Sequence, residues 1–271
     1  MSGTGRQEGA KRAEVPRKTG RTIGVIGGMG PLATADFYLR LVRATPAATD
    51  QEHLHVLIDS NPEIPDRTEA IEGRGPDPTP LLVETARRLV AAGAEVLVMP
   101  CNSAHAFLEQ VRGAVRVPVL DIMEEVASAA AALNPAPAAA GLLATSGTVR
   151  QRLYHTALSR RGIEVVVPDA AGQRVVSEII AAVKAGDTGS AVRGRIRDAA
   201  EALVGAGAGA IVLGCTELPL ILGPEDLAAP VLDGTEILAR AAIREGFGEY
   251  PSSRERSQGS IGASPRPVRR H

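Results

Sequence analysis

Aromatic residues and net charge are both scarce in this chain of 271 residues. It has no tryptophan, three tyrosines and three phenylalanines, so its core must be built from alanine, valine, leucine and isoleucine. The formal net charge of −1 gives no reason to expect a nucleic-acid partner. No apolar run reaches the ~18 residues of a membrane helix, because Asn134, Pro135 and Pro137 interrupt the alanine-rich stretch. We therefore expect no membrane span.

The N-terminal segment lacks the apolar stretch of a secretory signal. We expect a cytoplasmic protein whose ends, residues 1–20 and 249–271, form disordered tails because both are polar and basic. The chain has only two cysteines, Cys101 and Cys215. In a cytoplasmic chain of this length, two cysteines are more often free thiols than a disulfide.

Between the tails, short apolar runs alternate with longer segments of helical periodicity. This alternation is typical of a parallel sheet covered by helices on both faces, and it predicts a doubly wound α/β fold. The predicted strands are Thr22–Ile26, Leu54–Ile58, Glu95–Met99, Val117–Leu120, Ala140–Ala144, Glu164–Pro168, Ala210–Leu213 and Val231–Leu232. The predicted helices are Pro31–Arg43, Thr79–Ala92, Ser103–Arg112, Met123–Leu133, Thr148–Arg161, Arg174–Ala185, Ala191–Gly205 and Glu236–Glu245.

The two cysteines belong to an internal repeat. The segment ARRLVAAGAEVLVMPC, ending at Cys101, aligns without gaps on AEALVGAGAGAIVLGC, ending at Cys215. Each copy contains a helix, a glycine suited to its C-terminal cap, a strand, and a cysteine at the strand's end. A weaker similarity relates TIGVIGGMG to AGLLATSGT. We infer two similar α/β units related by a pseudo-twofold axis.

The cysteine positions predict a site, because ligands of open α/β sheets bind outside the carboxyl ends of the strands. The next residues, NSAH and TELP, are suited to starting a helix, whose positive end would lower the thiol pKa and whose backbone N–H groups could hold a carboxylate. Across a pseudo-twofold axis, one thiolate could remove a proton from a carbon atom while the other thiol protonates the opposite face. That reaction inverts a stereocentre without a cofactor.

Two cationic residues fit an anionic substrate, although their spacing alone also allows ordinary surface roles. Arg67 lies in SNPEIPDRTEAI after the second predicted strand, and arginine makes bidentate contacts with carboxylates. Lys184 ends a predicted helix before a glycine, where it could instead complement the helix C-terminus.

Other patterns suggest alternatives. The segment GMGPLA after the first strand fits the dinucleotide pattern G-x-G-x-x-A, and Asp59 ends the next strand, so an NAD-dependent dehydrogenase is possible in principle. That alternative leaves the paired cysteines unexplained. His53, His55 and His105 have no recognisable metal-ligand spacing, and we expect no metal. His105, four residues after Cys101, could assist near the cleft.

The motifs TIGVIGGMGPLATADFY, NPEIPDRTEAI, MPCNSAH, LLATSGT and LGCTELPLIL occur in this order between Thr22 and Ile243. Together they closely resemble the aspartate/glutamate racemase family, the aspartate racemase branch in particular. The resemblance implies two pseudo-symmetric α/β domains with the active site in the cleft between them. It also implies that the chain returns after the second cysteine, giving a first domain of residues 20–117 plus 226–248 and a second of residues 118–225.

The same resemblance implies roles for individual residues. Cys101 and Cys215 match the acid/base pair, and the matching substrate-binding positions are Met29, Gly30, Arg67, Asn102, Ser103, Ala104, Thr145, Lys184 and Thr216. Arg67 matches the residue that binds the side-chain carboxylate, and Lys184 a second cationic contact. Ser103 stands where threonine is usual, and it keeps the hydroxyl.

The implied activity is cofactor-independent racemisation of aspartate or glutamate, with an amino dicarboxylate as the ligand and a homodimer as the assembly. Hydantoin racemase, maleate isomerase and arylmalonate decarboxylase use related thiol chemistry and are the nearer alternatives. A solute-binding protein with the same two lobes is a non-enzymatic one.

Overall fold

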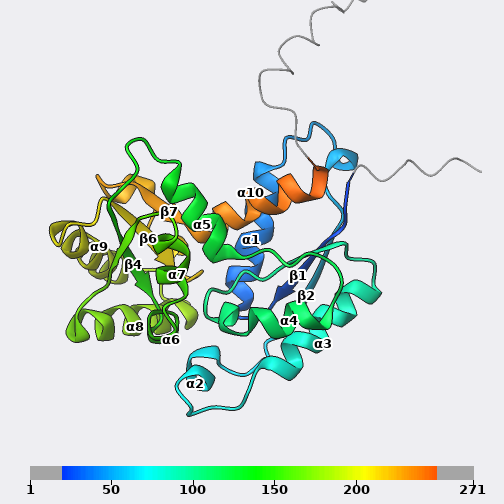
Figure 1. Ribbon diagram of the computed structural model, residues 1–271, viewed down its shortest axis with the longest axis horizontal. Helices are drawn as coiled ribbons and strands as arrows, with labels where there is room; N and C mark the ends of the chain where they lie inside the picture. The colour runs from blue at the N-terminus through cyan, green and yellow to red at the C-terminus, as the bar shows by residue number, and fades with distance from the viewer. Residues whose placement is uncertain (1–19, 249–271) are drawn as a thin grey trace, which may run out of the picture.

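The computed structural model describes residues 20–248, so the predicted tails lie outside the described residues, except for Gly20. The described part forms two parallel sheets, one in each half of the molecule (Figure 1). Their strands are β1 (Ile23–Gly27), β2 (Val56–Ser60), β3 (Val96–Val98), β4 (Ala139–Ala144), β5 (Glu164–Val166), β6 (Ala210–Gly214) and β7 (Val231–Asp233). This arrangement confirms the predicted α/β fold.

The helices flank these sheets. They are α1 (Pro31–Ala44), α2 (Arg67–Ile71), α3 (Thr79–Ala91), α4 (Leu108–Ala114), α5 (Ile122–Ala131), α6 (Ser146–Arg150), α7 (Leu153–Ser159), α8 (Ala170–Lys184), α9 (Ser190–Gly205) and α10 (Gly234–Phe247). In Figure 1, α3 and α4 lie beside the first sheet, α8 and α9 beside the second, and α1, α5 and α10 between the two halves.

The two sheets have the same order of strands. The first is β2-β1-β3, and the second is β5-β4-β6-β7. The predicted strand Val117–Leu120 forms only a single parallel bridge, between Val119 and Leu97 of β3. This bridge occupies the position that β7 has beside β6, so the halves match strand for strand.

The repeat containing the cysteines folds alike in both copies. Gly93 follows α3 with φ +104°, and Gly207 follows α9 with φ +100°, a conformation that favours glycine. In the first copy, Ala94 N–H donates to Leu89 O at 2.9 Å. In the second, Ala208 N–H donates to Leu203 O at 3.0 Å. Both glycines therefore end their helices in the same cap, as their register predicted.

A second, shorter sequence repeat lies at equivalent places in the two halves of the fold. The sequence Pro-Val-Leu-Asp occurs at residues 118–121, beside β3, and at residues 230–233, in and before β7. Asp121 caps α5, since its Oδ1 accepts from Met123 N–H at 2.9 Å. Asp233 caps α10 in the same way, accepting from Thr235 N–H at 2.9 Å. The pseudo-symmetry therefore extends beyond the cysteines.

The sheet pairing differs from the predicted domain limits at two points. Val119 lies past the predicted boundary at residue 117, yet it pairs with β3 of the first sheet. β7 lies within residues 226–248, assigned to the first domain, yet it pairs with β6 of the second. Each sheet takes its last strand from chain that the prediction gave to the other half. α10 then packs on α1 of the first half and on α5.

Three helical segments differ from their predictions. The helix predicted over Thr148–Arg161 is broken into α6 and α7, because Arg152 adopts a left-handed conformation with φ +52°. The one predicted over Ser103–Arg112 begins as a 3-10 turn, η2 (Ser103–Phe107), and continues as α4. α2 was not predicted, since five residues are too few to show helical periodicity.

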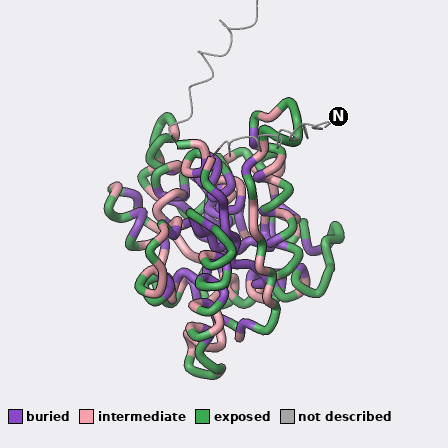
Figure 2. Tube along the Cα trace, turned by 90° about the vertical axis from the view of Figure 1, so that its right-hand side faces the viewer, coloured by how far each residue is buried: buried purple, intermediate pink, exposed green. Residues whose placement is uncertain are grey.

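The core is aliphatic, as the composition required. Buried residues run along the centre of the molecule in Figure 2, with exposed segments outside. Tyr154 and Phe37 are the two largest fully buried side chains, and the others are mostly isoleucine and leucine. Within residues 20–248, no helix combines the length and apolarity needed to cross a bilayer.

Candidate active site

Both cysteines lie at the carboxyl ends of their strands. Cys101 follows β3 and Cys215 directly follows β6, and each residue is 5% exposed. Both are free thiols. Each packs against the apolar residues of its own half. The segments that follow them are short 3-10 turns, η2 and η3 (Leu218–Leu220), rather than the helix N-termini that we expected.

The Cys215 thiol is bonded to a carboxylate that the sequence interpretation missed. Cys215 Sγ donates to Glu217 Oε2 at 2.9 Å, and Thr216 Oγ1 donates to the same oxygen at 3.4 Å. Ser103 is the equivalent residue in the first copy, and its Oγ lies 3.7 Å from Cys101 Sγ. The repeat in the sequence could have pointed to Glu217, because Ser103 and Glu217 each lie two residues after their cysteine.

The predicted lowering of the thiol pKa is wrong for Cys215. Burial raises the pKa of Cys215 well above its ordinary value, and the negative charge of Glu217 raises it further. Lys184 opposes this rise without cancelling it. A three-residue 3-10 turn offers little dipole to compensate. Cys215 is therefore a protonated thiol, and its S–H group donates a hydrogen bond to Glu217.

Lys184 connects the two copies electrostatically. Although burial lowers the pKa of Lys184, its interactions with the acidic groups of Cys215, Glu217, Cys101 and Asp66 together raise that pKa above its usual value. Its Nζ lies 4.0 Å from Asp66 Oδ2 of the first half. The lysine at the end of α8 therefore lies within the electrostatic influence of both thiols, one from each half.

A cavity of about 330 Å³ opens beside these groups. Its walls come from both halves and consist of Gly28, Met29, Gly30, Pro31, Leu32, Ala33, Pro62, Ile64, Asp66, Arg67, Val183, Lys184, Glu217 and Leu220. Four predicted site residues are among them: Met29, Gly30, Arg67 and Lys184. A Cβ on Gly30 would lie 3.4 Å from Glu217 Oε1, so the loop after β1 faces the carboxylate bonded to Cys215.

Arg67 presents a buried guanidinium held by backbone carbonyls. It is 7% exposed, and its Nη1 donates to Ile64 O at 3.1 Å and to Pro65 O at 3.0 Å. Nη2 donates to Met29 O at 3.4 Å, while Nε has no hydrogen-bond partner in the described part of the chain. A buried cation bound mainly by carbonyls keeps its full charge available for an anionic ligand.

Asn102, next to Cys101, is also buried, with 3% of its surface exposed. Its Oδ1 accepts a 2.5 Å hydrogen bond from the Tyr154 hydroxyl of α7. Its Nδ2 is buried and has no hydrogen-bond partner among residues 20–248. An unpaired buried donor costs about 1–3 kcal/mol, which a ligand acceptor would recover.

His105 holds the backbone of the Cys101 loop rather than its thiol. Its Nε2 accepts from Ile122 N–H at 3.2 Å, so the ring proton must be on Nδ1, which lies 2.9 Å from Cys101 O. Burial lowers the pKa of His105, and the ring is therefore neutral. It links the backbone of the Cys101 loop to the start of α5.

The remaining predicted positions lie around the cavity rather than in its lining. Ala104 is fully buried in the apolar cluster of the first half, so only its backbone could contact a ligand. Thr145 caps α6, accepting from Thr148 N–H at 3.3 Å, and lines a neighbouring cavity of about 470 Å³ together with Asp66 and Lys184. The lining of the main cavity does not include Cys101, Asn102, Ser103, Cys215 or Thr216, but it includes Glu217, which is hydrogen-bonded to Cys215.

The two halves also meet where α2 contacts α6. Ser146 Oγ, at the start of α6, donates to Glu72 Oε1 at 2.7 Å, at the end of α2. A Cβ on Gly147 would lie 3.0 Å from Thr68 Oγ1, so these helices are in close contact. The segment that contains Arg67 therefore touches the loop that follows β4.

The structure also bears on the residues that suggested a dehydrogenase or a metal site. The Asp59 carboxylate, which a dehydrogenase would use for ribose, is bound to Arg88 at 2.8 Å. Among the described residues, no group of three histidine, cysteine or acidic side chains is arranged to hold a metal ion.

Comparison with known proteins establishes the family. A model of the Asp/Glu/Hydantoin racemase family matches residues 26–242. The chain belongs to the Asp/Glu/hydantoin racemase family. It is therefore an amino-acid racemase, which confirms the resemblance in its motifs and excludes the dehydrogenase.

Three known racemases each match more than four fifths of the chain. The aspartate racemase of Picrophilus torridus is 32% identical with a TM-score of 0.75, covering 83% of this chain and 94% of that one. The broad specificity amino-acid racemase RacX of Bacillus subtilis (strain 168) is 28% identical over 229 residues, 82% of this chain and 96% of the relative. A glutamate racemase from Francisella tularensis, solved with D-glutamate, shares the fold at 20% identity and a TM-score of 0.59; the match covers 82% of this chain and 80% of that one.

Proposed function

We propose that this racemase interconverts L- and D-aspartate without a cofactor, by proton transfer between Cys101 and Cys215. The supporting observation is the repeat itself, which brings a thiol to the end of the equivalent strand in each half. The pKa of Lys184 is influenced by both thiols. Two acid/base groups related by pseudo-symmetry suit a substrate carbon whose two faces must be treated alike.

The reaction needs one thiolate and one thiol. One sulfur removes the α-hydrogen as a proton, leaving a carbanion, and the other sulfur protonates the opposite face. The net result is inversion, with one proton taken up and one released by the pair. Cys215, whose pKa is raised, is the natural proton donor in one direction. In the other direction it must be deprotonated, and Glu217, 2.9 Å away, can accept its proton.

The negative charge of the carbanion spreads into the α-carboxylate, which must therefore be held by donors. Asn102 Nδ2 and the hydroxyls of Ser103 and Thr216 lie in the two cysteine loops, and the backbone of Ala104 lies beside them. We assign these groups to the α-carboxylate. Their burial excludes water and strengthens each contact.

Arg67 and Lys184 are the groups assigned to the side-chain carboxylate, with Met29 and Gly30 lining the pocket beside them. The two cations line one cavity and come from opposite halves. This arrangement favours an amino dicarboxylate over a neutral amino acid. The Picrophilus relative is an aspartate racemase, whereas RacX is named for broad specificity, so aspartate is the first substrate to test and neutral amino acids are the second.

The test is a panel of L-aspartate, L-glutamate, L-alanine, a 5-substituted hydantoin and maleate, with racemisation followed by polarimetry and maleate isomerisation by NMR. Aspartate should be racemised with the highest kcat/KM. Preference for the hydantoin or turnover of maleate would instead assign one of the related thiol-dependent activities. The homodimer implied by the resemblance is proposed with this function, and sedimentation equilibrium measures it directly.

A further inference from the structure

Tyr154 is a fully buried polar side chain that the proposed mechanism leaves unused. It lies on α7, is 0% exposed, and packs within the apolar cluster of the interface between the halves. Its hydroxyl donates to Asn102 Oδ1 at 2.5 Å, across 52 residues of sequence. A residue of the second half thus contacts the residue that follows Cys101.

We infer that Tyr154 is a positioning residue: its hydroxyl fixes the side-chain amide of Asn102 so that Nδ2, and not Oδ1, is the end left free for the substrate carboxylate. This inference rests on the proposed role of Asn102. A side-chain amide has one donor end and one acceptor end of nearly equal size. Only the donor end can bind a carboxylate, so the orientation of the amide decides whether the site attracts or repels its ligand.

The hydroxyl is suited to this task because it remains a donor. Burial raises the pKa of Tyr154, so the phenol keeps its proton over the working pH range. A donor at this position bonds the amide oxygen and leaves Nδ2 without a partner in the described residues. The opposite orientation would place the amide oxygen where the carboxylate is proposed to bind.

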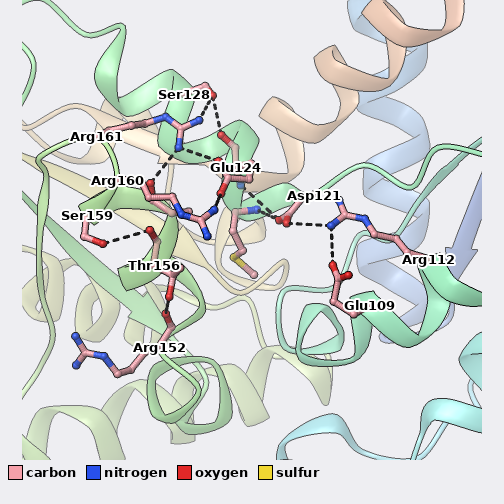
Figure 3. A network of polar contacts seen from close by, with 12 residues as sticks. Glu109, Arg112, Asp121, Glu124, Ser128, Arg152, Thr156, Ser159, Arg160 and Arg161 are labelled. Carbon is pink, nitrogen blue, oxygen red and sulfur yellow. Dashed lines mark hydrogen bonds and ion pairs between the residues drawn. The ribbon is translucent and has the colours of Figure 1, made fainter.

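The surrounding structure holds the phenol in place. The left-handed Arg152 ends α6 and redirects the chain into α7. α7 is then attached to α5, since Arg161 donates to Glu124 Oε2 at 2.8 Å and to Ser128 Oγ at 2.8 Å, and Arg160 to Glu124 Oε1 at 3.0 Å (Figure 3). The start of α10 packs against the phenol, because a Cβ on Gly234 would lie 3.4 Å from its oxygen, an ordinary contact distance.

The decisive variant is Tyr154→Phe, which keeps the ring and removes the hydroxyl. Loss of a fixed donor to the carboxylate weakens substrate binding, and it weakens the transition state further because negative charge grows on the carboxylate in the carbanion. KM should therefore rise about tenfold, and kcat should fall as well. Tyr38→Phe, at an exposed tyrosine of α1, is the matched control and should leave both constants unchanged. The kinetic constants are measured with whichever amino acid of the panel the wild type racemises fastest, so a substrate other than aspartate does not affect the test.

A double-mutant cycle distinguishes orientation from packing. Asn102→Ser replaces the amide by a hydroxyl that has no second end to misplace. If Tyr154 acts through Asn102, Tyr154→Phe should change KM less than about twofold in the Asn102→Ser background. Calorimetric binding of the same amino acid to the four proteins gives this coupling even where turnover is slow.

Equal, additive effects of Tyr154→Phe in both backgrounds would overturn the inference while leaving the proposed function intact. An unchanged KM and Kd in Asn102→Ser alone would instead refute the carboxylate role of Asn102, and the inference with it.

Discussion

The thiol of Cys215 and the carboxylate of Glu217 form a 2.9 Å hydrogen bond, whereas the equivalent pair in the first half is Cys101 and the hydroxyl of Ser103. The two halves are thus symmetric in backbone and asymmetric in proton chemistry. One thiol has a carboxylate to receive its proton, and the other has a neutral hydroxyl.

This asymmetry predicts that Glu217→Gln lowers the pKa of Cys215, because the negative charge that helps raise it is removed. The measurement is thiolate absorbance at 240 nm against pH in a Cys101→Ala background, where Cys215 is the only cysteine. The inflection should move to lower pH. Glu225→Gln, at an exposed glutamate nearby, should leave the inflection in place, and a Glu217→Gln protein that titrates like its parent would contradict the assigned cause.

Replacing either cysteine should abolish racemisation. Cys101→Ala and Cys215→Ala each remove one of two obligatory proton-transfer groups, and a positioned acid/base group contributes about 10²–10⁴-fold. We expect kcat to fall by at least about 10³-fold in each variant. Circular dichroism and the melting temperature serve as the control for folding. A variant with near wild-type turnover would remove its cysteine from the mechanism.

Arg67→Ala should discriminate between substrates. Charge-assisted hydrogen bonds contribute about 1.5–3 kcal/mol each, so kcat/KM for aspartate should fall by about 10–100-fold. Alanine has no side-chain carboxylate, and its kcat/KM should change little. Arg87→Ala, at an exposed position of α3, is the control for charge alone. Equal losses for both substrates would show that Arg67 does not bind the side-chain carboxylate.

His105 predicts a pH dependence of stability. Burial lowers the pKa of His105 in the folded protein, whereas an unfolded histidine titrates near 6.5. Between these two values the unfolded chain binds the extra proton and the folded chain does not. The free energy of unfolding should therefore fall as pH drops below about 6.5, with a slope of up to about 1.4 kcal/mol per pH unit from this residue.

Urea denaturation between pH 7 and pH 5 measures that slope. His105→Asn should flatten it, since the titrating group is gone. The pKa of His155 is also lowered by burial, but this residue is only half-buried. His155→Asn should therefore reduce the slope by less than His105→Asn does. If His105→Asn keeps the full slope, the neutral clamp between Cys101 and Ile122 is not the source of the pH dependence.

The sequence predicted most of the fold because the relevant signals are local. Gly93 and Gly207 end their helices in the same cap, and the strands before Cys101 and Cys215 are continuous apolar runs. The cavity contains Arg67 and Lys184, and the spacing of each alone was ambiguous. Arg67 lies in the motif NPEIPDRTEAI, whereas Lys184 lies outside the motifs that carry the resemblance.

What the sequence did not predict depends on contacts between distant segments. The bond from Tyr154 to Asn102 spans 52 residues, and nothing local distinguishes Tyr154 from a core tyrosine. The raised pKa of Cys215 follows from burial and from the rotamer of Glu217, neither of which a motif contains. That Val119 belongs to the first sheet and β7 to the second depends on which strands they pair with.

The central claim is that two sulfur atoms treat opposite faces of one carbon, and the position of deuterium tests it most directly. L-aspartate is incubated with the wild-type enzyme in deuterated water, and both enantiomers are analysed by NMR after a small fraction of conversion. The D-aspartate formed should have deuterium at the α-carbon, while the remaining L-aspartate should keep its hydrogen. Deuterium entering the L-aspartate pool as fast as D-aspartate appears would show that one base serves both faces, and would contradict the assignment of Cys101 and Cys215.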